Sequence, residues 1–385
     1  MKASAALVVG DVGTEEAAVR AALEACDGLG GLTPDLAVVF VSRHYHREAA
    51  YFLRALNEVL GHVPLIGCAA ESVIGGAQEV EDAPAVSLWL AAGTGPVETF
   101  SVEHLATPGG GLFVGDRFEA GCGPYLVLAD PFGFPVPDLL AHLDDNVPQA
   151  TVIGGLAGAG ESLGSSTLFL DDQVLRSGAV VATLTGAQVD LLVSQGCRPI
   201  GNPYTVTGCE GNVVHGIGGR PPFQRLQELV ATLPEADRQL LAEGGLQVGQ
   251  VIDEYRHEQR RGDFLVHSVV GADPGSGAIV VGADVRLGQT LQFHVRDAAS
   301  ADEDLVETLE QEVAGLEGIA VQGALVFTCN GRGMRLFEHP DHDAALVSKL
   351  LGDVPVAGAF CAGELGPVGG RNFLHSFTAC VAVFR

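Results

Sequence analysis

Apolar and polar positions follow one another along the chain in blocks that have the lengths of strands and helices. Residues 36–41 form an uninterrupted apolar run, which is typical of a strand that is covered on both faces. Residues 48–60 then carry apolar side chains every three or four positions, as one face of a helix requires. A second apolar run with a Gly-rich loop covers residues 63–71, and a further strand covers residues 85–90. The pattern predicts a strand, a helix, a strand, a loop and another strand.

This order of elements occurs three times, and the internal repeat is the most informative feature of the sequence. We therefore expect three similar structural units, of which the second is the weakest copy. The third copy consists of residues 324–329, 343–351, 354–364 and 377–384, and the second of residues 125–129, a short helix after Pro137, and residues 151–161 and 179–184.

Two further helices are predicted outside the repeats, over residues 223–233 and 305–313. Ser300 and Glu303 have the spacing of a capping box, so we expect them to begin the second of these helices. The remaining apolar segments are strand-like and are separated by glycine, which favours hairpins or extensions of the sheets. These segments are residues 189–194, 203–217, 264–269, 278–285 and 290–295.

Together these elements predict an α/β fold in which mixed β-sheets form a layered sandwich with flanking helices. The sandwich is expected to be built from the repeated strand-helix-strand-strand unit. The least repetitive and most polar part of the sequence places a domain junction near residues 225–245. We expect an N-terminal domain over residues 1–225 and a C-terminal domain over residues 226–385.

The charge balance excludes several classes of partner. Lys and Arg number 21 and Asp and Glu number 48, so the net charge is −27, and nucleic acid or an anionic membrane would be repelled over most of the surface. No apolar run approaches the ~20 residues of a membrane-spanning helix. The chain starts with one Lys and a very short apolar run, which indicates a first strand rather than a secretory signal. A cytoplasmic protein is therefore expected.

The cysteine and histidine patterns predict neither a metal site nor a cofactor. The eight cysteines are scattered and include no Cys-x-x-Cys pair, which argues against disulfides and zinc. Residues 338–343 contain two histidines and three acids, but Pro340 breaks the helical spacing that would aim both imidazoles at one ion. The Gly-rich runs lack a following Lys and Ser or Thr, so no phosphate-binding loop is predicted.

Polar side chains follow the buried strand of the third repeat. Asn330 and Arg332 come directly after this strand, and Cys361 and Glu364 lie in the next Gly-rich loop. Small molecules bind beyond the strand ends of α/β sheets, where loops present backbone amides and a few polar side chains. An Arg that holds a carboxylate and a Glu that accepts from an amine would together recognise a zwitterion such as an amino acid. The alternative is that Arg332 and Glu364 pair with each other and lock the loops.

The first repeat offers a parallel set of candidate ligand contacts. Arg43 follows its first strand, and Cys68 and Glu71 lie in its Gly-rich loop. For any one loop, the alternative is that glycine only allows a tight turn between packed strands. The predicted ligand contacts of the third repeat are completed by Arg371, Asn372 and His375.

Cys361 and His375 could also form the nucleophile and base of a thiol enzyme. No helix directly follows Cys361 to lower its pKa, and no third group is evident to orient His375. Cys68 and Cys361 could together suggest two-thiol racemase chemistry on an amino acid. We predict no catalytic residue, and a cysteine-dependent enzyme on a small amino-acid-like substrate is the alternative function.

Several motifs resemble those of the FIST family, which is named for F-box and intracellular signal transduction proteins. The resemblance covers nearly the whole chain, with an N-terminal FIST module to about residue 225 and a C-terminal FIST module after it. The motifs that carry it are residues 63–76, 196–201, 262–265, 293–297, 330–333 and 358–375.

The resemblance implies a sensory module that binds a small molecule, with amino acids as the favoured ligands, and that acts with kinase, chemotaxis or F-box partners. No residues are left in this chain for such a transmitter, so a signal would leave through a signalling protein partner or through oligomerisation. Three functions follow: a small-molecule sensor, the cysteine-dependent enzyme, and a ligand-free scaffold whose loops contact another protein.

Overall fold

The computed structural model describes residues 1–107, 110–255 and 262–385. The chain divides into two compact units. Unit 1 consists of Met1–Val193, Leu305–Leu374 and Thr378–Arg385, and unit 2 of Ser194–Asp304 and His375–Phe377. The last part of the chain therefore returns to complete unit 1.

Two sheets form unit 1. In the described part of the chain, the first sheet has six strands in the order β1 (Lys2–Val9), β6 (Ala85–Ala92), β2 (Leu36–Ser42), β3 (Leu65–Ala70), β11 (Leu168–Leu170) and β12 (Gln173–Leu175). The helices beside it are α1 (Thr14–Leu29) and α2 (Ala49–Leu60), and the 3-10 helix η1 (Arg43–Glu48) precedes α2.

The second sheet is larger. Its strands follow the path β14 (Val189–Gln195), β25 (Thr378–Phe384), β22 (Gly323–Cys329), β23 (Val356–Val368), β10 (Val152–Ala157), β9 (Tyr125–Ala129), β13 (Ala179–Thr183), β7 (Thr99–Thr107) and β8 (Gly110–Val114). The short strands beside this path are β4 (Val73–Gly75), β5 (Gln78–Val80) and β24 (Arg371–His375). The helices that accompany it are α3 (Val136–Asn146), α6 (Ala298–Gly315), α7 (Met334–Phe337) and α8 (His342–Leu351).

The three repeats expected from the sequence are present in the strand pairing. In each repeat the first strand pairs in parallel with the strand after the helix and antiparallel with the last strand. The three sets are β2, β3 and β6, then β9, β10 and β13, then β22, β23 and β25. The second and third repeats share one sheet because β10 pairs antiparallel with β23.

The Gly-rich segments of the repeats lie in strands, which corrects the expectation of ligand-binding loops at these positions. In each repeat, one glycine of the Gly-rich strand lies directly opposite a valine of the parallel partner strand. A Cβ atom there would overlap the carbonyl oxygen of that valine, so close backbone approach requires glycine. The pairs are Gly67 with Val39, Gly154 with Val127, and Gly358 with Val326.

The short segment that follows the Gly-rich strand of each repeat pairs with, or hydrogen-bonds to, a different repeat. The hairpin β4–β5 of the first repeat pairs with β23 of the third, and the hairpin β11–β12 of the second pairs with β3 of the first. In the third repeat, Asn372 in β24 accepts from the backbone N of Val152 and donates to the carbonyl oxygen of Ala150, at the start of β10. The exchange is cyclic and ties the repeats together.

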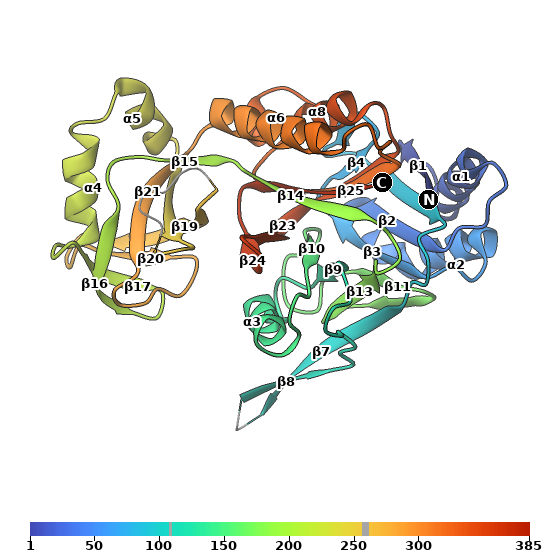
Figure 1. Ribbon diagram of the computed structural model, residues 1–385, viewed down its shortest axis with the longest axis horizontal. Coiled ribbons are helices and arrows are strands. Elements are labelled where there is room, and N and C mark those ends of the chain that lie inside the picture. The colour runs from blue at the N-terminus through green and yellow to red at the C-terminus, as the bar shows by residue number, and fades with distance from the viewer. Residues whose placement is uncertain (108–109, 256–261) are drawn as a thin grey trace. The chain divides into compact units, whose positions relative to one another are not determined.

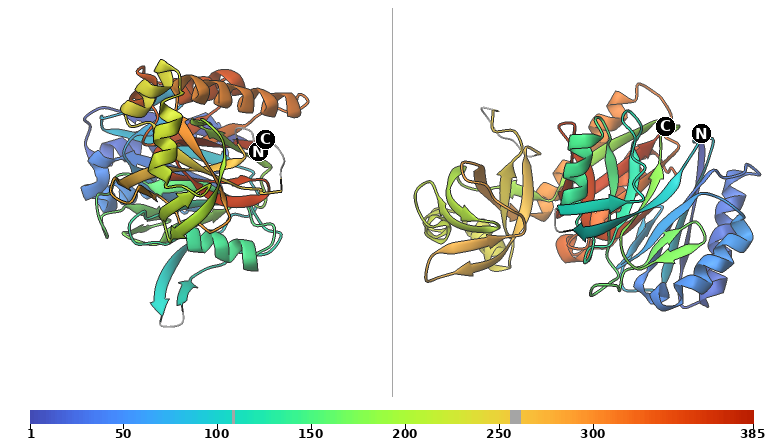
Figure 2. Two further views of the ribbon diagram at one scale, coloured as in Figure 1. Left: turned by 90° about the vertical axis from the view of Figure 1, so that its left-hand side faces the viewer. Right: turned by 90° about the horizontal axis from the view of Figure 1, so that it is seen from below.

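The two sheets pack face to face, and helices cover their outer faces (Figures 1 and 2). Phe40 of the first sheet meets Phe327 of the second edge to face, with ring centroids 5.8 Å apart. Trp89 and Phe384 make a second contact between the sheets at 4.6 Å. The outer clusters lie under α1 and α2 on one side and under α6 and α8 on the other. The predicted α/β layered sandwich of mixed sheets is confirmed.

The helix predictions need correction. The pattern predicts neither helix α1 nor the helix over Glu235–Ala242. Helix α6 begins at Ala298, before the expected start, and its first turn is capped by Asp297 rather than by Ser300. Asp297 accepts from the backbone N of Ala299 at 3.2 Å and from Ser300 Oγ at 2.9 Å, so the Ser300 hydroxyl is a donor inside the helix.

Unit 2 is built around a closed β-barrel, because β18 pairs with both β19 and β21. Apolar side chains fill its interior, where a cavity of only about 10 Å³ is found between Tyr204, Val248 and Phe293. This volume is too small for a ligand. The strands are β15 (Cys197–Pro199), β16 (Tyr204–Glu210), β17 (Val213–Ile217), β18 (Leu246–Val251), β19 (Phe264–Asp273), β20 (Ala278–Val281) and β21 (Thr290–Arg296), with helices α4 (Pro222–Val230) and α5 (Glu235–Ala242).

Candidate functional site

The first and third repeats meet at the carboxyl ends of β3 and β22. Glu71 directly follows β3, Asn330 directly follows β22, and Arg335 lies in α7. Arg335 Nη1 donates to the carbonyl oxygen of Asn330 at 2.8 Å, and its Nη2 forms an ion pair with Glu71. The Arg335 side chain is 58% exposed and that of Glu71 is 21% exposed. We refer to Glu71, Asn330 and Arg335 as the edge site.

The carboxamide of Asn330 carries an acceptor that the described residues do not satisfy. Its Oδ1 is buried without a hydrogen-bond partner among them, although the backbone N of Asn330 donates to the carbonyl oxygen of Cys361 at 2.8 Å. Gly158 faces this carboxamide so closely that a Cβ atom would lie 3.0 Å from Asn330 Nδ2. An unpaired buried carbonyl oxygen is costly. A donor from a ligand would therefore gain more here than at an already paired group.

Acidic side chains surround Arg335. Glu81 Oε1 accepts from the backbone N of Met334 at 3.0 Å, and burial raises the pKa of Glu81 while Arg335 opposes that rise. Glu71, Asp82 and Glu81 all raise the pKa of Arg335, with the hydrogen bond to Glu71 as the largest cause. The edge site therefore has one accessible guanidinium near three acidic side chains, of which Asp82 also pairs with Arg43.

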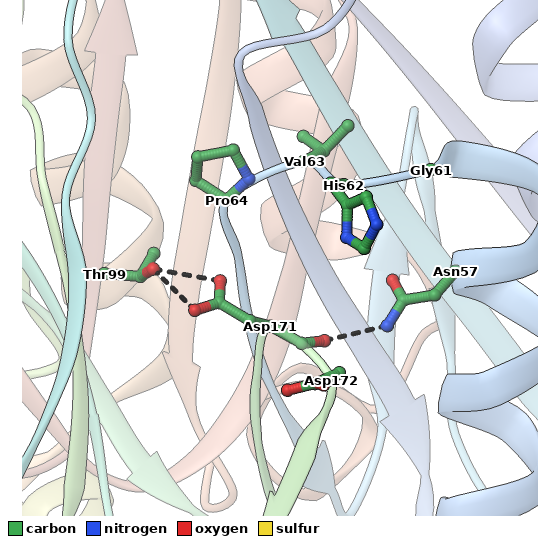
Figure 3. A pocket seen from close by; sticks show the side chains of 8 residues that line it. All are labelled: Asn57, Gly61, His62, Val63, Pro64, Thr99, Asp171 and Asp172. Carbon is green, nitrogen blue, oxygen red and sulfur yellow. Dashed lines mark hydrogen bonds between the residues drawn. The ribbon is translucent and has the colours of Figure 1, made fainter.

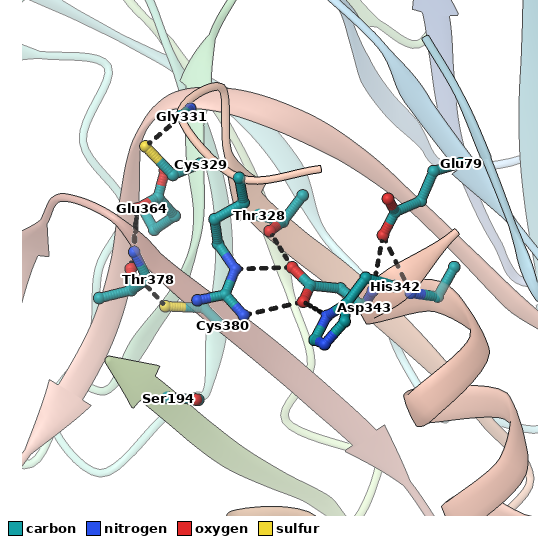
Figure 4. Close-up of polar contacts among 12 residues, drawn as sticks. Glu79, Ser194, Thr328, Cys329, Gly331, His342, Asp343, Glu364, Thr378 and Cys380 are labelled. Atoms are coloured by element: carbon teal, nitrogen blue, oxygen red, sulfur yellow. Dashed lines mark hydrogen bonds and ion pairs between the residues drawn. The ribbon is translucent and has the colours of Figure 1, made fainter. Parts of the chain in front are cut away.

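Arg332, the guanidinium predicted to hold a ligand carboxylate, is occupied inside the protein. Its side chain is fully buried, and it donates from Nε to Asp343 Oδ2 at 2.7 Å and from Nη2 to Asp343 Oδ1 at 2.8 Å (Figure 4). Thr328 Oγ1 adds a hydrogen bond of 2.6 Å to the same carboxylate. Arg332 keeps the pKa of Asp343 well below its usual range, although burial alone would raise it. The structure thus pairs Arg332 with Asp343 and not, as the alternative supposed, with Glu364.

Glu364, predicted to accept an amine, is also sealed from solvent. It is fully buried, and Thr378 donates to Glu364 Oε2 from Oγ1 at 2.7 Å and from its backbone N at 3.3 Å (Figure 4). Burial raises the pKa of Glu364 to about 8, so the protonated form prevails near neutral pH. The ligand contacts predicted at Arg332 and Glu364 are therefore closed to solvent, because both side chains are fully buried.

The models of two protein-family domains match this chain and together cover most of it. The FIST N domain matches residues 35–220, and the FIST C domain matches residues 222–367. The chain belongs to the FIST family. FIST domains are associated with signal transduction and small-ligand sensing.

Relatives of this FIST protein are known in mycobacteria. An uncharacterized protein of Mycobacterium tuberculosis strain H37Rv is 47% identical over 369 residues, which are 96% of both chains. An uncharacterized protein of Mycobacterium bovis is 46% identical over 370 residues, which are 96% of this chain and 95% of its own. In the part of this FIST chain that the structure describes, no helix has the length and apolarity that crossing a membrane requires.

The cysteines of this FIST protein carry free thiols, and the two predicted site cysteines lie in the core between the sheets. Burial raises the pKa of Cys68 to about 12 and the pKa of Cys361 well above its ordinary value. Cys361 Sγ donates to the carbonyl oxygen of Ala359 at 3.6 Å. His375 is buried and belongs to unit 2. A protonated, enclosed thiol is a poor nucleophile, so the geometry does not favour the cysteine-dependent enzyme.

The remaining predicted contacts have structural partners. Asn372 is buried and bonds the start of β10, as described above. Arg371 forms an ion pair of 3.1 Å with Asp144 and is 65% exposed. Arg43 pairs with Asp82 at 2.9 Å on the surface, rather than with Glu71. Among the residues that the structure describes, His, Cys, Asp and Glu form no group of three that could hold a metal.

A cavity of about 440 Å³ opens near the amino end of β3 (Figure 3). Asp171 lies at its centre, and the Asp171 carboxylate accepts from Thr99 Oγ1 at 2.9 Å and from the backbone N of Leu65 at 3.0 Å. The carbonyl oxygen of Asp171 accepts from Asn57 Nδ2 at 2.9 Å. The Asp171 carboxylate, its carbonyl oxygen, Thr99 and Asn57 are therefore already paired with one another or with the backbone.

The sequence predicts Asn330 and Glu71 as ligand contacts, but it does not predict Arg335. Arg332 and Arg335 both follow β22, and their side chains are chemically identical. They differ in burial, since the Arg332 side chain lies in the core and the Arg335 side chain lies at the surface. Arg335 lies in the short helix α7, which begins at Met334, and the apolar pattern does not predict this helix.

Proposed function

We propose that this FIST protein senses a small zwitterion, with an amino acid as the simplest case, and that the ligand binds at the edge site. The supporting observation is the accessible Arg335–Glu71 ion pair, whose Arg335 also donates to the backbone carbonyl oxygen of Asn330, a residue with a buried, unpaired Oδ1. A ligand carboxylate would replace Glu71 on the Arg335 guanidinium. The ligand ammonium group would then donate to the released Glu71, and also to Asn330 Oδ1 once the Asn330 side chain turns this buried atom outward.

The surrounding charge favours a zwitterion over an anion. Glu81 and Asp82 act on Arg335 together with Glu71, and the whole chain has a net charge of −27. A free dicarboxylate would meet this negative field without an ammonium group to balance it. Neutral amino acids should therefore bind better than aspartate or glutamate, and an amine without a carboxylate should leave Arg335 unpaired.

The proposed signal is a change in how α7 is held between two repeats. In the core, Arg332 forms an ion pair with Asp343. At the surface, Arg335 forms an ion pair with Glu71. A ligand that takes over Arg335 and Glu71 replaces a direct contact between the first and third repeats by a bridged one. Exposed ion pairs contribute about 0–1 kcal/mol, so a ligand can compete with this pair at small cost. The signal would then pass to a signalling protein partner.

Location in the cytoplasm is part of the proposal. Eight free thiols suit a compartment that keeps cysteines reduced. Fractionation of cells that produce the natural protein, followed by detection with an antibody, tests this location. Recovery in the secreted fraction would contradict it.

A thermal-shift screen with the twenty amino acids tests the ligand. A ligand at a hundred times its Kd stabilises the folded state by about 2.7 kcal/mol, so a true ligand should raise the Tm by several degrees. The Arg335→Ala variant should lose this rise. The matched control is Arg371→Ala, which removes a similarly exposed ion pair with Asp144 and should keep the rise.

Two results would contradict the proposed function. One is the absence of any amino-acid-dependent shift in the wild-type protein. The other is a shift that survives Arg335→Ala, because the ligand would then bind elsewhere. Isothermal titration calorimetry with the stabilising amino acid separates these cases from a change in folding, since it measures binding by each folded variant directly.

A further inference from the structure

The hairpin formed by β7 and β8 projects from the end of the second sheet of unit 1 (Figures 1 and 2). The two strands pair antiparallel, with His104 opposite Phe113 and Leu105 opposite Leu112. β8 is the last strand on the path of this sheet, so its outer backbone groups have no partner strand among the described residues. Such an edge is a template for pairing with another strand.

One face of the hairpin is anchored and the other is open. The Phe113 ring lies 5.8 Å from the ring of Phe134 and 5.5 Å from that of His142, a residue of α3. Side chains alternate between the faces of a strand, so Leu105 and Leu112 lie on the opposite face. Leu105 is 49% exposed and Leu112 is 55% exposed. The open face therefore presents a cross-strand pair of leucines to solvent.

The composition of β8 contrasts with that of the whole chain. Residues 110–115 contain no charged side chain, whereas the chain has a net charge of −27. Two copies of such an acidic chain repel each other over most of their surfaces. Approach through β8 brings them together along a strand that adds no charge of its own.

We propose that β8 pairs antiparallel with β8 of a second copy of this chain, so that the second sheet continues across a two-fold axis. With Leu112 of both copies at the axis, Gly111 of each copy lies opposite Phe113 of the other. A glycine opposite an aromatic ring leaves room for that ring. The leucine pairs of the two hairpins then form one apolar stripe of four side chains, and the same patch serves both copies, as a two-fold interface requires.

Light scattering after size-exclusion chromatography tests this dimer on the full chain. The wild-type protein should have twice the mass of one chain at micromolar concentration. Dimers should be more stable at about 500 mM than at about 50 mM NaCl, because salt screens the repulsion between acidic chains. The Leu112→Lys variant should be a monomer, since it places two like charges at the axis.

The matched control is Leu163→Lys, which makes the same chemical change at a leucine that is 74% exposed in a loop of unit 1. This variant should remain a dimer. Far-UV circular dichroism of both variants should match the wild-type protein, which shows that a lost dimer is not a lost fold. Leu112→Lys should still unfold at a lower temperature, because dimerisation stabilises the folded chain. A wild-type monomer at both salt concentrations, a Leu112→Lys dimer, or loss of the dimer in both variants would overturn the proposal.

Hydrogen exchange provides a second measurement that does not depend on a substitution. The backbone amides of residues 111–114 should become more protected as the concentration of the wild-type protein rises. Protection that is independent of concentration in a protein that dimerises would place the interface elsewhere and overturn the proposal.

Discussion

Arg332 and Arg335 show how burial gives two identical side chains different properties. The buried Arg332 needs the two hydrogen bonds that it donates to the Asp343 carboxylate, because an unpaired charge in the core would be strongly destabilising. The exposed Arg335 is solvated and can exchange Glu71 for another carboxylate at small cost. At the scale of single residues, accessibility therefore decides which of the two can take part in binding.

Glu364 provides a prediction on pH dependence. Its pKa is raised to about 8 in the folded protein from an ordinary value of 4.5. Between these pH values the folded state holds the proton that the unfolded state has released, so this residue makes the protein less stable as pH rises through the window. Glu364→Gln cannot lose a proton and should be more stable than the wild-type protein at pH 9, by on the order of a few kcal/mol.

Urea unfolding of both proteins across this range measures the effect. At pH below about 4 the wild-type carboxyl is mostly protonated in both states, so the advantage of the amide should disappear there. The control is Glu235→Gln, because the Glu235 side chain is 83% exposed and its removal should not change the pH dependence. A constant difference in stability between Glu364→Gln and wild-type protein over this range would contradict the prediction.

At the scale of elements, α8 is capped by a residue from a distant part of the sequence. Asp341 precedes the helix with φ of 65° and forms no side-chain cap. Instead, Glu79 Oε1 accepts from the backbone N of Asp343 at 2.9 Å and from that of Ala344 at 3.1 Å. Asp341 Oδ1 in turn accepts from the backbone N of Glu79 at 2.7 Å. The first repeat thereby completes a helix of the third.

Glu79→Ala should destabilise the protein by about 1–2 kcal/mol, because it leaves two backbone donors at the start of α8 without a partner. Burial and Asp343 raise the pKa of Glu79 to about 8, so neutral Gln resembles the form present near pH 7. Glu79→Gln should therefore retain most of the stability. Guanidinium unfolding at pH 7 measures both variants, and equal losses in the two would refute the capping role.

Helix α1 shows why a buried helix can be absent from the pattern of large apolar side chains. Its buried face consists mostly of alanines, with Leu29 at its end. Alanine is a strong helix former but gives little contrast between apolar and polar positions. The helix is held mainly by close packing against the first sheet and α2, which periodicity of large side chains does not reveal.

At the scale of the whole molecule, unit 1 is stabilised by the cyclic exchange of short segments between the repeats. Each exchanged segment continues the sheet or satisfies the strand end of a different repeat. No repeat is therefore complete alone, and we expect unit 1 to unfold as one cooperative body.

Asn372→Ala tests this exchange. It leaves the backbone N of Val152 and the carbonyl oxygen of Ala150 without their buried partner, and should cost about 2–4 kcal/mol. The neighbouring Arg371→Ala removes only an exposed ion pair and should cost about 1 kcal/mol or less. Urea unfolding compares the two variants. Similar losses in both would show that the Asn372 contacts contribute little.

The repeat, the buried strands and the class of fold could be predicted from the sequence, because apolar periodicity reports which faces must be covered. The polar residues after β22 and β3 could be identified as well, and Asn330 and Glu71 do lie together. The pattern could not identify the Gly-rich segments as strands, since glycine is required both in turns and where two backbones approach closely.

Partner choice for the polar side chains was decided only by the tertiary structure. The sequence by itself determined that acids and guanidiniums of two repeats come to one edge of the sheets, because equivalent strands carry them. It did not determine that Asp343, from the start of α8, takes Arg332, or that Arg335 reaches Glu71. Arg332 and Asp343 are 11 positions apart in the chain, and Arg335 and Glu71 are 264 positions apart. Which of these side chains become buried, and which come close together, is not contained in local sequence patterns.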